Sequence, residues 1–94
     1  MNVAKTIAAT STSILNQQSL RASIALVNSG LLDVWVSKGS TAAVGSGILL
    51  KADGGSYTEG RNSLDEPLYT GPYSAIAVSG TANMGVTEDY YDFI

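Results

Sequence analysis

The sequence predicts a small all-β protein, an antiparallel β-sandwich or barrel with an arm at each end. Charged residues make up only 14% of the chain, against about 25% in typical domains. Short apolar runs alternate with polar residues, and turn residues such as Gly, Asn and Pro recur about every ten residues. That rhythm is typical of sandwiches and small barrels.

The length of 94 residues predicts one domain with a small core. Domains of this size bury only about 60–65% of their unfolded surface, and they often depend on disulfides, metals or oligomerisation for stability. The chain has no cysteine and no histidine, which removes disulfides and the commonest metal ligand. We therefore expect self-association, or docking onto a larger partner.

Three segments follow one another along the chain. Residues 1–18 favour β-structure but end in a polar run, so they form either a first core strand or an arm exchanged between copies. Residues 19–88 carry the regular alternation and are predicted to be the sandwich domain. Residues 89–94 form a short tail rich in aromatic side chains, and such termini are usually tied down onto another surface.

Two strands are predicted at the start of the domain, at residues 21–28 and 32–37. Both alternate at the period of a half-buried strand. The inward-facing side chains would be those of Ala22, Ile24, Leu26, Leu32, Val34 and Val36. The turn residues Asn28-Ser29-Gly30 between the two strands predict a hairpin that pairs them directly.

Four shorter strands are expected in the second half, separated by turns that contain Gly, Asn, Asp or Pro. They are residues 48–51, 56–58, 73–78 and 83–88. Two irregular stretches interrupt them, a loop of small residues at 38–47 and a polar excursion at 59–67.

The residues argue against catalysis. A Ser–His or Cys–His nucleophile system cannot form without His or Cys, and Lys38 beside serines lies in a glycine-flanked loop that favours a solvated lysine. The stretch from Gly39 to Gly47 lacks the Lys-Ser/Thr pair of a phosphate-binding loop, and the acidic residues near the C-terminus do not have calcium-loop spacing. We predict no enzyme, and no catalytic, cofactor-binding or metal site.

The charge distribution argues against nucleic acid and membranes as partners. The net charge is −3, and the five basic residues are scattered singly, whereas nucleic-acid binding needs a basic face that neutralises phosphates. No stretch approaches the roughly 20 apolar residues of a membrane span, and the N-terminus lacks the apolar core of a signal peptide.

Two sets of side chains are candidates for contacts with a partner. Trp35 alternates out of phase with the predicted core face, so it belongs to a second core layer, anchors an interface or, less favoured, binds a sugar. At the C-terminus, four large side chains have no obvious place in the sandwich, and we expect them to form an arm that contacts a neighbour. These are Tyr90, Tyr91, Phe93 and Ile94.

The order of several motifs is similar to that in a known group of proteins. An apolar strand ending in Asn28-Ser29-Gly30 is followed by Leu-Asp-Val-Trp-Val-Ser (32–37), a Gly/Ser/Thr loop (39–47), Gly-Gly-Ser-Tyr (54–57) and a closing hairpin (69–88). Over residues 21–88 the chain resembles the small β-sandwich virion proteins of tailed bacteriophages. The individual motifs are common, and the likeness lies in their order.

The resemblance implies a capsid decoration, or cement, protein. Such a protein would bind the major capsid protein on the outer surface of the capsid and stabilise it, as a homo-dimer or homo-trimer. It would be made in the host cytoplasm and end up in the virion. Two alternatives remain open, a carbohydrate- or receptor-binding module of a phage fibre, and a head–tail or tail component.

Overall fold

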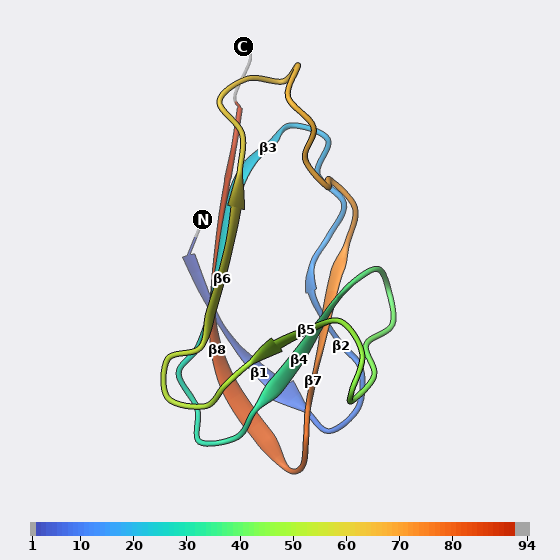
Figure 1. Cartoon of the computed structure of the whole chain (residues 1–94), viewed down its shortest axis with the longest axis vertical. Coiled ribbons are helices and arrows are strands. Elements are labelled where there is room, and N and C mark those ends of the chain that lie inside the picture. Colours follow the sequence, from blue (N-terminus) through green and yellow to red (C-terminus); the bar gives the residue numbers. More distant parts are fainter. Residues whose placement is uncertain (1, 92–94) are drawn as a thin grey trace.

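The computed structural model describes residues 2–91 and contains eight β-strands and no helix within them (Figure 1). The strands are β1 (Asn2–Ala8), β2 (Thr12–Leu15), β3 (Arg21–Asn28), β4 (Val34–Lys38), β5 (Ile48–Leu50), β6 (Ser56–Gly60), β7 (Tyr73–Ala77) and β8 (Thr81–Tyr90). In this part of the chain there is no helix of the length and apolar character needed to cross a membrane.

The strands form two four-stranded antiparallel sheets that pack face to face. Sheet A has the order β1-β8-β3-β6, and sheet B has the order β2-β7-β4-β5. Because β1 and β2 follow each other in the chain, as do β5 and β6, the edges of the two sheets lie in matching pairs on opposite sides of the sandwich (Figure 1). The prediction of an all-β antiparallel sandwich is confirmed.

The core lies between the sheets, and alternation decides which side chains enter it. In β3 and β4 the buried positions include Ile24, Leu26, Val34 and Val36, as the period of two predicted. Leu32 is partly buried and packs against the same cluster. The buried apolar cluster contains Ile7, Ile14, Leu15, Ile24, Leu26, Val34, Val36, Leu50, Tyr73, Ala75, Ala77, Ala82, Met84 and Val86.

The predicted hairpin between β3 and β4 is wrong. β3 pairs with β6 and β8, while β4 pairs with β5 and β7, so the connection crosses from one sheet to the other. The cause is Asn28, which is fully buried and organises a corner. Its Nδ2 donates to the carbonyl oxygens of Leu32 (2.8 Å) and Leu50 (2.9 Å), and its Oδ1 accepts from the backbone N–H of Gly30 (3.0 Å).

The N-terminal segment is built into both sheets of its own chain. β1 pairs with β8 at every position from Asn2 to Ala8, and β2 pairs with β7. Of the two expectations for residues 1–18, the structure has the core strand, and it divides the segment into two strands instead of one.

The predicted boundary between domain and tail, at residue 88, is two residues too early. β8 continues to Tyr90, because Asp89 pairs with Ser23 and Tyr90 with Arg21 across a register shift in β3. The backbone N–H of Tyr91 then donates to the carbonyl of Leu20 at 2.8 Å. The remaining tail residues, with Phe93 and Ile94, lie outside the described residues.

Candidate functional site

An apolar row crosses the outer face of sheet B. Trp35 on β4 is paired with Leu49 on β5 and with Ile76 on β7. These three residues alternate with the buried positions of their strands, so their side chains point away from the core. Leu49 remains 38% exposed, while Trp35 and Ile76 are half-buried. We call these three residues the outer row.

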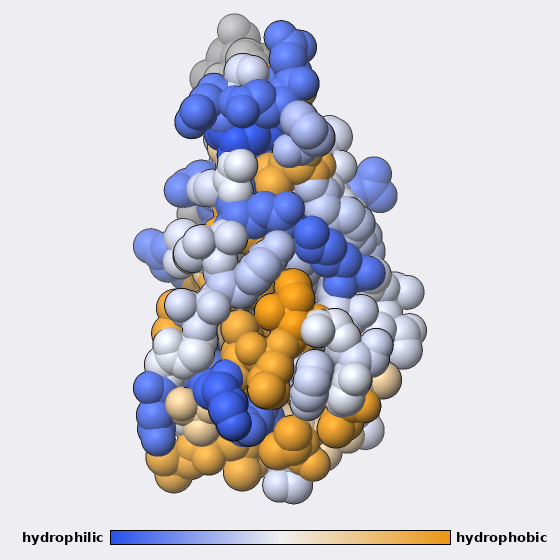
Figure 2. Space-filling model, in the orientation of Figure 1, coloured by the Kyte–Doolittle hydropathy of each residue, from blue (hydrophilic) through white to orange (hydrophobic). Residues whose placement is uncertain are grey.

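The surroundings of the outer row are less apolar. Asp33 and Lys51 are 3.7 Å apart in an exposed ion pair, and Asp33 Oδ1 also accepts from the N–H of Ala52. Val78, two residues beyond Ile76, is 43% exposed. Figure 2 shows apolar side chains gathered over β5 and at the end of the molecule where β7 turns into β8.

A loop limits the open part of sheet B. Residues 39–47 connect β4 to β5, and the hydroxyl of Ser74 on β7 donates to the carbonyl of Gly39 at 2.8 Å. Further along the loop, the N–H of Ala42 donates to Ser11 Oγ at 2.8 Å, just before β2. The loop therefore reaches from β7 to β2. The outer row, on β5, β4 and β7, remains partly exposed, with Leu49 as its most exposed member.

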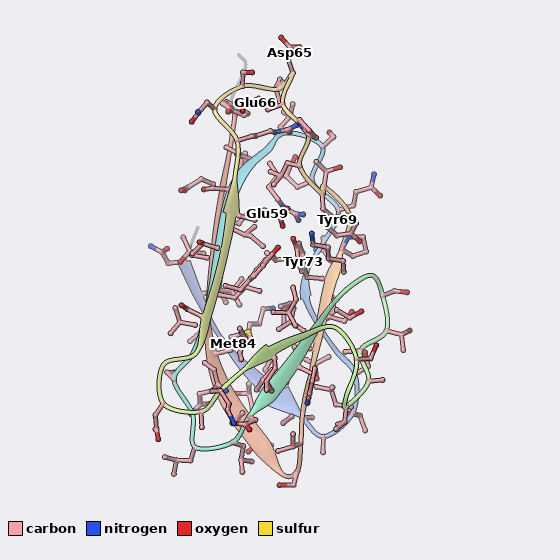
Figure 3. The ribbon with its side chains drawn as sticks, in the orientation of Figure 1. Glu59, Asp65, Glu66, Tyr69, Tyr73 and Met84 are labelled. Atoms are coloured by element: carbon pink, nitrogen blue, oxygen red, sulfur yellow. The ribbon has the colours of Figure 1, made fainter. Side chains whose placement is uncertain are left out.

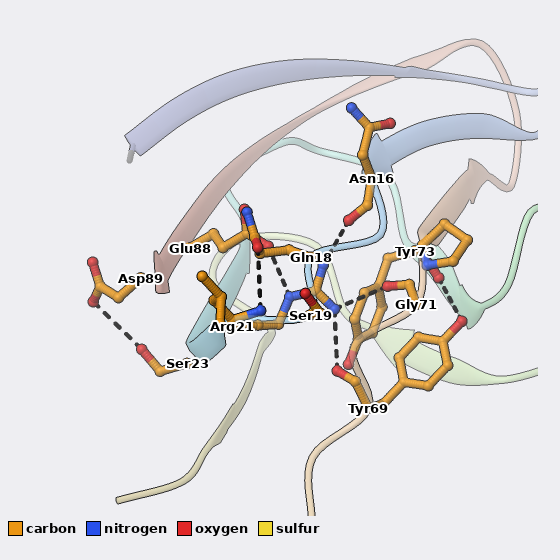
Figure 4. Close-up of polar contacts among 12 residues, drawn as sticks. Asn16, Gln18, Ser19, Arg21, Ser23, Tyr69, Gly71, Tyr73, Glu88 and Asp89 are labelled. Carbon is orange, nitrogen blue, oxygen red and sulfur yellow. Dashed lines mark hydrogen bonds and ion pairs between the residues drawn. The ribbon is translucent and has the colours of Figure 1, made fainter. Parts of the chain in front are cut away.

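A buried arginine ties the two sheets together at the other end of the sandwich. The Arg21 side chain is fully buried, and its Nε donates to Glu88 Oε2 at 2.7 Å. Its other two nitrogens donate to the carbonyl oxygens of Tyr69, Gly71 and Asn16, at 2.8–3.1 Å (Figure 4). The guanidinium carbon also lies 5.4 Å from the centre of the Tyr73 ring. Arg21 thus joins β3, β8 and two connecting segments.

A second polar cluster lies between β6 and sheet B (Figure 3). Glu59 Oε2 accepts from the hydroxyls of Tyr57 (2.8 Å) and Tyr73 (3.0 Å), and the Lys38 ammonium is 3.3 Å from the same oxygen. Tyr69 stacks edge-on against Tyr73, with ring centres 5.2 Å apart, and donates to the carbonyl of Pro72. Within residues 2–91, no buried side-chain nitrogen or oxygen lacks a hydrogen-bond partner.

The contacts in this cluster change the proton affinities of its members. Burial alone would raise the pKa of the Glu59 carboxyl, but hydrogen bonds from Tyr57, Tyr73 and Lys38 outweigh it and hold that pKa below its ordinary value. Burial and the bond to Glu59 raise the pKa of Tyr73 far above its ordinary range. For Lys38, partial burial lowers the pKa, but the hydrogen bond and charge of Glu59 raise it overall.

These shifts predict a stability plateau between about pH 4.5 and 10. The lowered pKa of Glu59 contributes stability above the ordinary pKa of 4.5, and this is lost as the pH falls and the folded carboxylate takes up a proton. The raised pKa of Tyr73 contributes stability below its ordinary pKa of 10.0, lost as the pH rises. Urea unfolding measured from pH 3 to pH 11 should show both declines. Glu59→Gln should reduce the loss of unfolding free energy below about pH 4.5. If this loss is as steep in the variant as in the wild type, the assignment to Glu59 is wrong.

The predicted contact residues do not come together in one surface. Trp35 lies on the outer face of sheet B, whereas Tyr90 ends β8 in sheet A and is 52% exposed. Tyr91 is half-buried, and its hydroxyl donates to the carbonyl of Arg61 at 3.1 Å. The expectation of an aromatic arm without a place in the sandwich is therefore wrong for Tyr90 and Tyr91, because the backbone of both is bonded to the domain.

The sequence reasoning missed the buried polar residues. Asn28 lies in phase with Ile24 and Leu26, so its alternation already indicated an inward side chain. Arg21 lies out of phase with them and turns inward because the pairing of β3 with β8 shifts between Arg21 and Ser23. Nothing in the local sequence marks that shift. Among the described residues, no cluster of three or more acidic, Cys or His side chains could hold a metal ion.

Comparison of the chain with protein-family models, with curated proteins and with solved structures found no match. The outer row offers apolar area without a nucleophile, an acid–base pair or a metal ligand within it, and that composition suits binding to another protein surface.

Proposed function

We propose that this chain is a structural protein of a bacteriophage virion, a decoration protein that binds the major capsid protein on the outer capsid surface. The observation that carries the proposal is the outer row, because Trp35, Leu49 and Ile76 present apolar area on a face that the described residues leave partly exposed. Trp is enriched among the residues that dominate binding energies at protein interfaces. The ion pair Asp33–Lys51 supplies part of a polar rim.

The mechanism is linkage between binding and assembly. A protein that binds the assembled shell more tightly than free subunits stabilises the shell by mass action. Each small module contributes little, but many copies act on one particle, and association between copies as dimers or trimers adds avidity. No catalytic group is needed for this role.

The alternative of a carbohydrate-binding module on a fibre has less support. Sugar binding through Trp35 and the tyrosines needs these rings to form one open surface. The hydroxyls of Tyr57 and Tyr73 donate to Glu59, and that of Tyr69 donates to Pro72. The three tyrosines belong to a cluster between the sheets, whereas Trp35 points outward from sheet B.

The test is binding to purified capsid shells that lack the protein, with light scattering and sedimentation as readouts. The wild-type chain should saturate the shells at a fixed ratio. Leu49→Ser should weaken binding about tenfold, which corresponds to about 1.4 kcal/mol. Val27→Ser is a matched control, because Val27 is 39% exposed on the outer face of sheet A, against 38% for Leu49.

Three outcomes decide between the possibilities. Loss of binding in Leu49→Ser alone supports the proposal. If Leu49→Ser and Val27→Ser lose shell binding to the same extent, the outer row is not the contact with the capsid. A wild-type protein that ignores the shells at any concentration overturns the decoration role.

A further inference from the structure

A groove opens between the two sheets on the side of β1 and β2. Both strands are sheet edges, and they splay apart from the turn that joins them (Figure 1). The groove has a volume of about 410 Å³. Its apolar lining comes from Val3 on β1 and from Ile14 and Leu15 on β2, and the last two are almost completely buried. The other lining residues are polar or aromatic, namely Lys5, Asn16, Gln17, Gln18, Glu88 and Tyr90. The groove thus has a mixed lining and is bordered by two strands at the edges of their sheets.

β1 is the longest edge strand of the molecule. It has seven residues and pairs with β8 without a register shift. The other edges carry features that block further pairing: β5 has three residues, β2 has four and a register shift, and β6 ends in Gly60 after a Glu. Within residues 2–91 no strand covers the second side of β1. The N–H of Ala8 donates to Thr12 Oγ1 at 3.3 Å. The other N–H and C=O groups of β1 that point away from β8 are open to another strand.

One charge distinguishes the groove. Lys5 lies at the centre of β1, is half-buried and lines the groove. Within the described part of the chain it forms no ion pair, since the ion pairs there involve Arg21, Lys38 and Lys51. Glu88 also lines the groove, but its carboxylate is 2.7 Å from the buried Arg21, so that pair is neutral together. Lys5 is therefore the only basic residue among the described residues that line the groove.

We propose that β1 and the groove beside it bind an extended segment of a partner protein, which adds to sheet A as a further strand. The segment places one acidic side chain near Lys5 and an apolar side chain against the partly exposed Val3. Backbone hydrogen bonds supply affinity in this mode, and the alternate side chains that enter the groove supply specificity.

A second copy of this chain is the wrong occupant for the edge. If two β1 strands paired antiparallel about their centres, Lys5 of one copy would face Lys5 of the other. Like charges directly opposite each other destabilise a strand pair, and an inward-pointing lysine is a known device against pairing between identical edges. Lys5 thus discourages self-pairing and selects a strand of complementary charge.

The test uses two capped heptapeptides, TVTETVT and TVTKTVT, titrated into the full chain labelled with ¹⁵N. TVTETVT should shift the amide signals of β1 and bind at least about tenfold more tightly than TVTKTVT. Two forms of TVTETVT with methylated backbone nitrogens then test strand pairing. One form carries the methyl groups on the two valines and the glutamate, and the other carries them on the two inner threonines. Because only alternate N–H groups of an added strand face its neighbour, one form should lose binding and the other should keep it.

Charge reversal at Lys5 is the second part of the test. Lys5→Glu should reverse the preference and favour TVTKTVT. Thr58→Glu should leave the preference unchanged, because Thr58 is exposed on β6, at the opposite edge of sheet A from β1. The folded state of each variant is checked by its own amide spectrum. The proposal is overturned if neither peptide shifts β1 signals at about 1 mM, if both bind equally, or if both N-methylated forms bind.

This inference does not rest on the decoration role, since the outer row faces away from the core whereas the groove opens between the sheets. The peptide titration uses no capsid shells. A failure of the peptides to bind β1 and a failure of the protein to bind shells are therefore separate results.

Discussion

Replacing Arg21 by leucine is expected to lower the free energy of unfolding by about 3–5 kcal/mol, the usual cost of removing one partner from a buried ion pair. Glu88 is only 7% exposed and loses the guanidinium that lies 2.7 Å from its carboxylate. The carbonyl oxygens of Asn16, Tyr69 and Gly71 lose their donors at the same time. Small domains have about 0.05–0.15 kcal/mol of stability per residue, so this loss is a large share of the total.

Urea unfolding of purified Arg21→Leu, followed by the fluorescence of Trp35, measures the effect. Lys51→Leu is the control, because its side chain is 74% exposed and its ion pair spans 3.7 Å, and such surface changes usually stay within about 0.5 kcal/mol. The double variant Arg21→Leu/Glu88→Leu should be less destabilised than the sum of the two single variants. A single variant as stable as the wild type would show that the Arg21–Glu88 pair does not hold the sheets together.

Asn28→Ala is expected to cost about 3 kcal/mol. The side chain makes three hydrogen bonds in a buried corner, and each typically contributes about 1 kcal/mol net. Loss of the side chain also leaves the carbonyls of Leu32 and Leu50 without this donor. The expected result is a lower urea midpoint and faster amide exchange in residues 29–33, the connection between β3 and β4.

Asn83→Ala is the matched control for this corner. Asn83 lies on β8, is exposed and points away from the core, so its replacement should change stability by less than about 0.5 kcal/mol. If both asparagine variants lose the same stability, the corner is not held by the Asn28 side chain.

Alternation predicted the faces of the strands well and their pairing poorly. Residues 21–28 bury Ile24 and Leu26 as their period of two requires, because side chains of a strand point alternately to its two sides. The hairpin failed because Asn-Ser-Gly is compatible both with a tight turn and with a corner. Choosing between them depends on the acceptors Leu32 and Leu50, and Leu50 is 22 residues away.

The candidate contact surface was predictable only in part. Trp35 was expected opposite the core face of its strand and lies there. Its neighbours Leu49 and Ile76 could not be assigned, because the pairing of β4 with β5 and β7 is non-local. Tyr90 and Tyr91 were misplaced, since their backbone partners lie in residues 20 and 21, about 70 positions earlier in the chain.

The sequence by itself determined the fold class, the inward faces of the central strands and the absence of Cys and His chemistry, because composition and a period of two are local properties of the chain. The tertiary structure decided the strand order, the inward turn of Arg21, the outer row and the groove beside β1. Each of these depends on which distant segments become neighbours. That choice is made by the total burial and hydrogen bonding of the whole sandwich, which no single segment encodes.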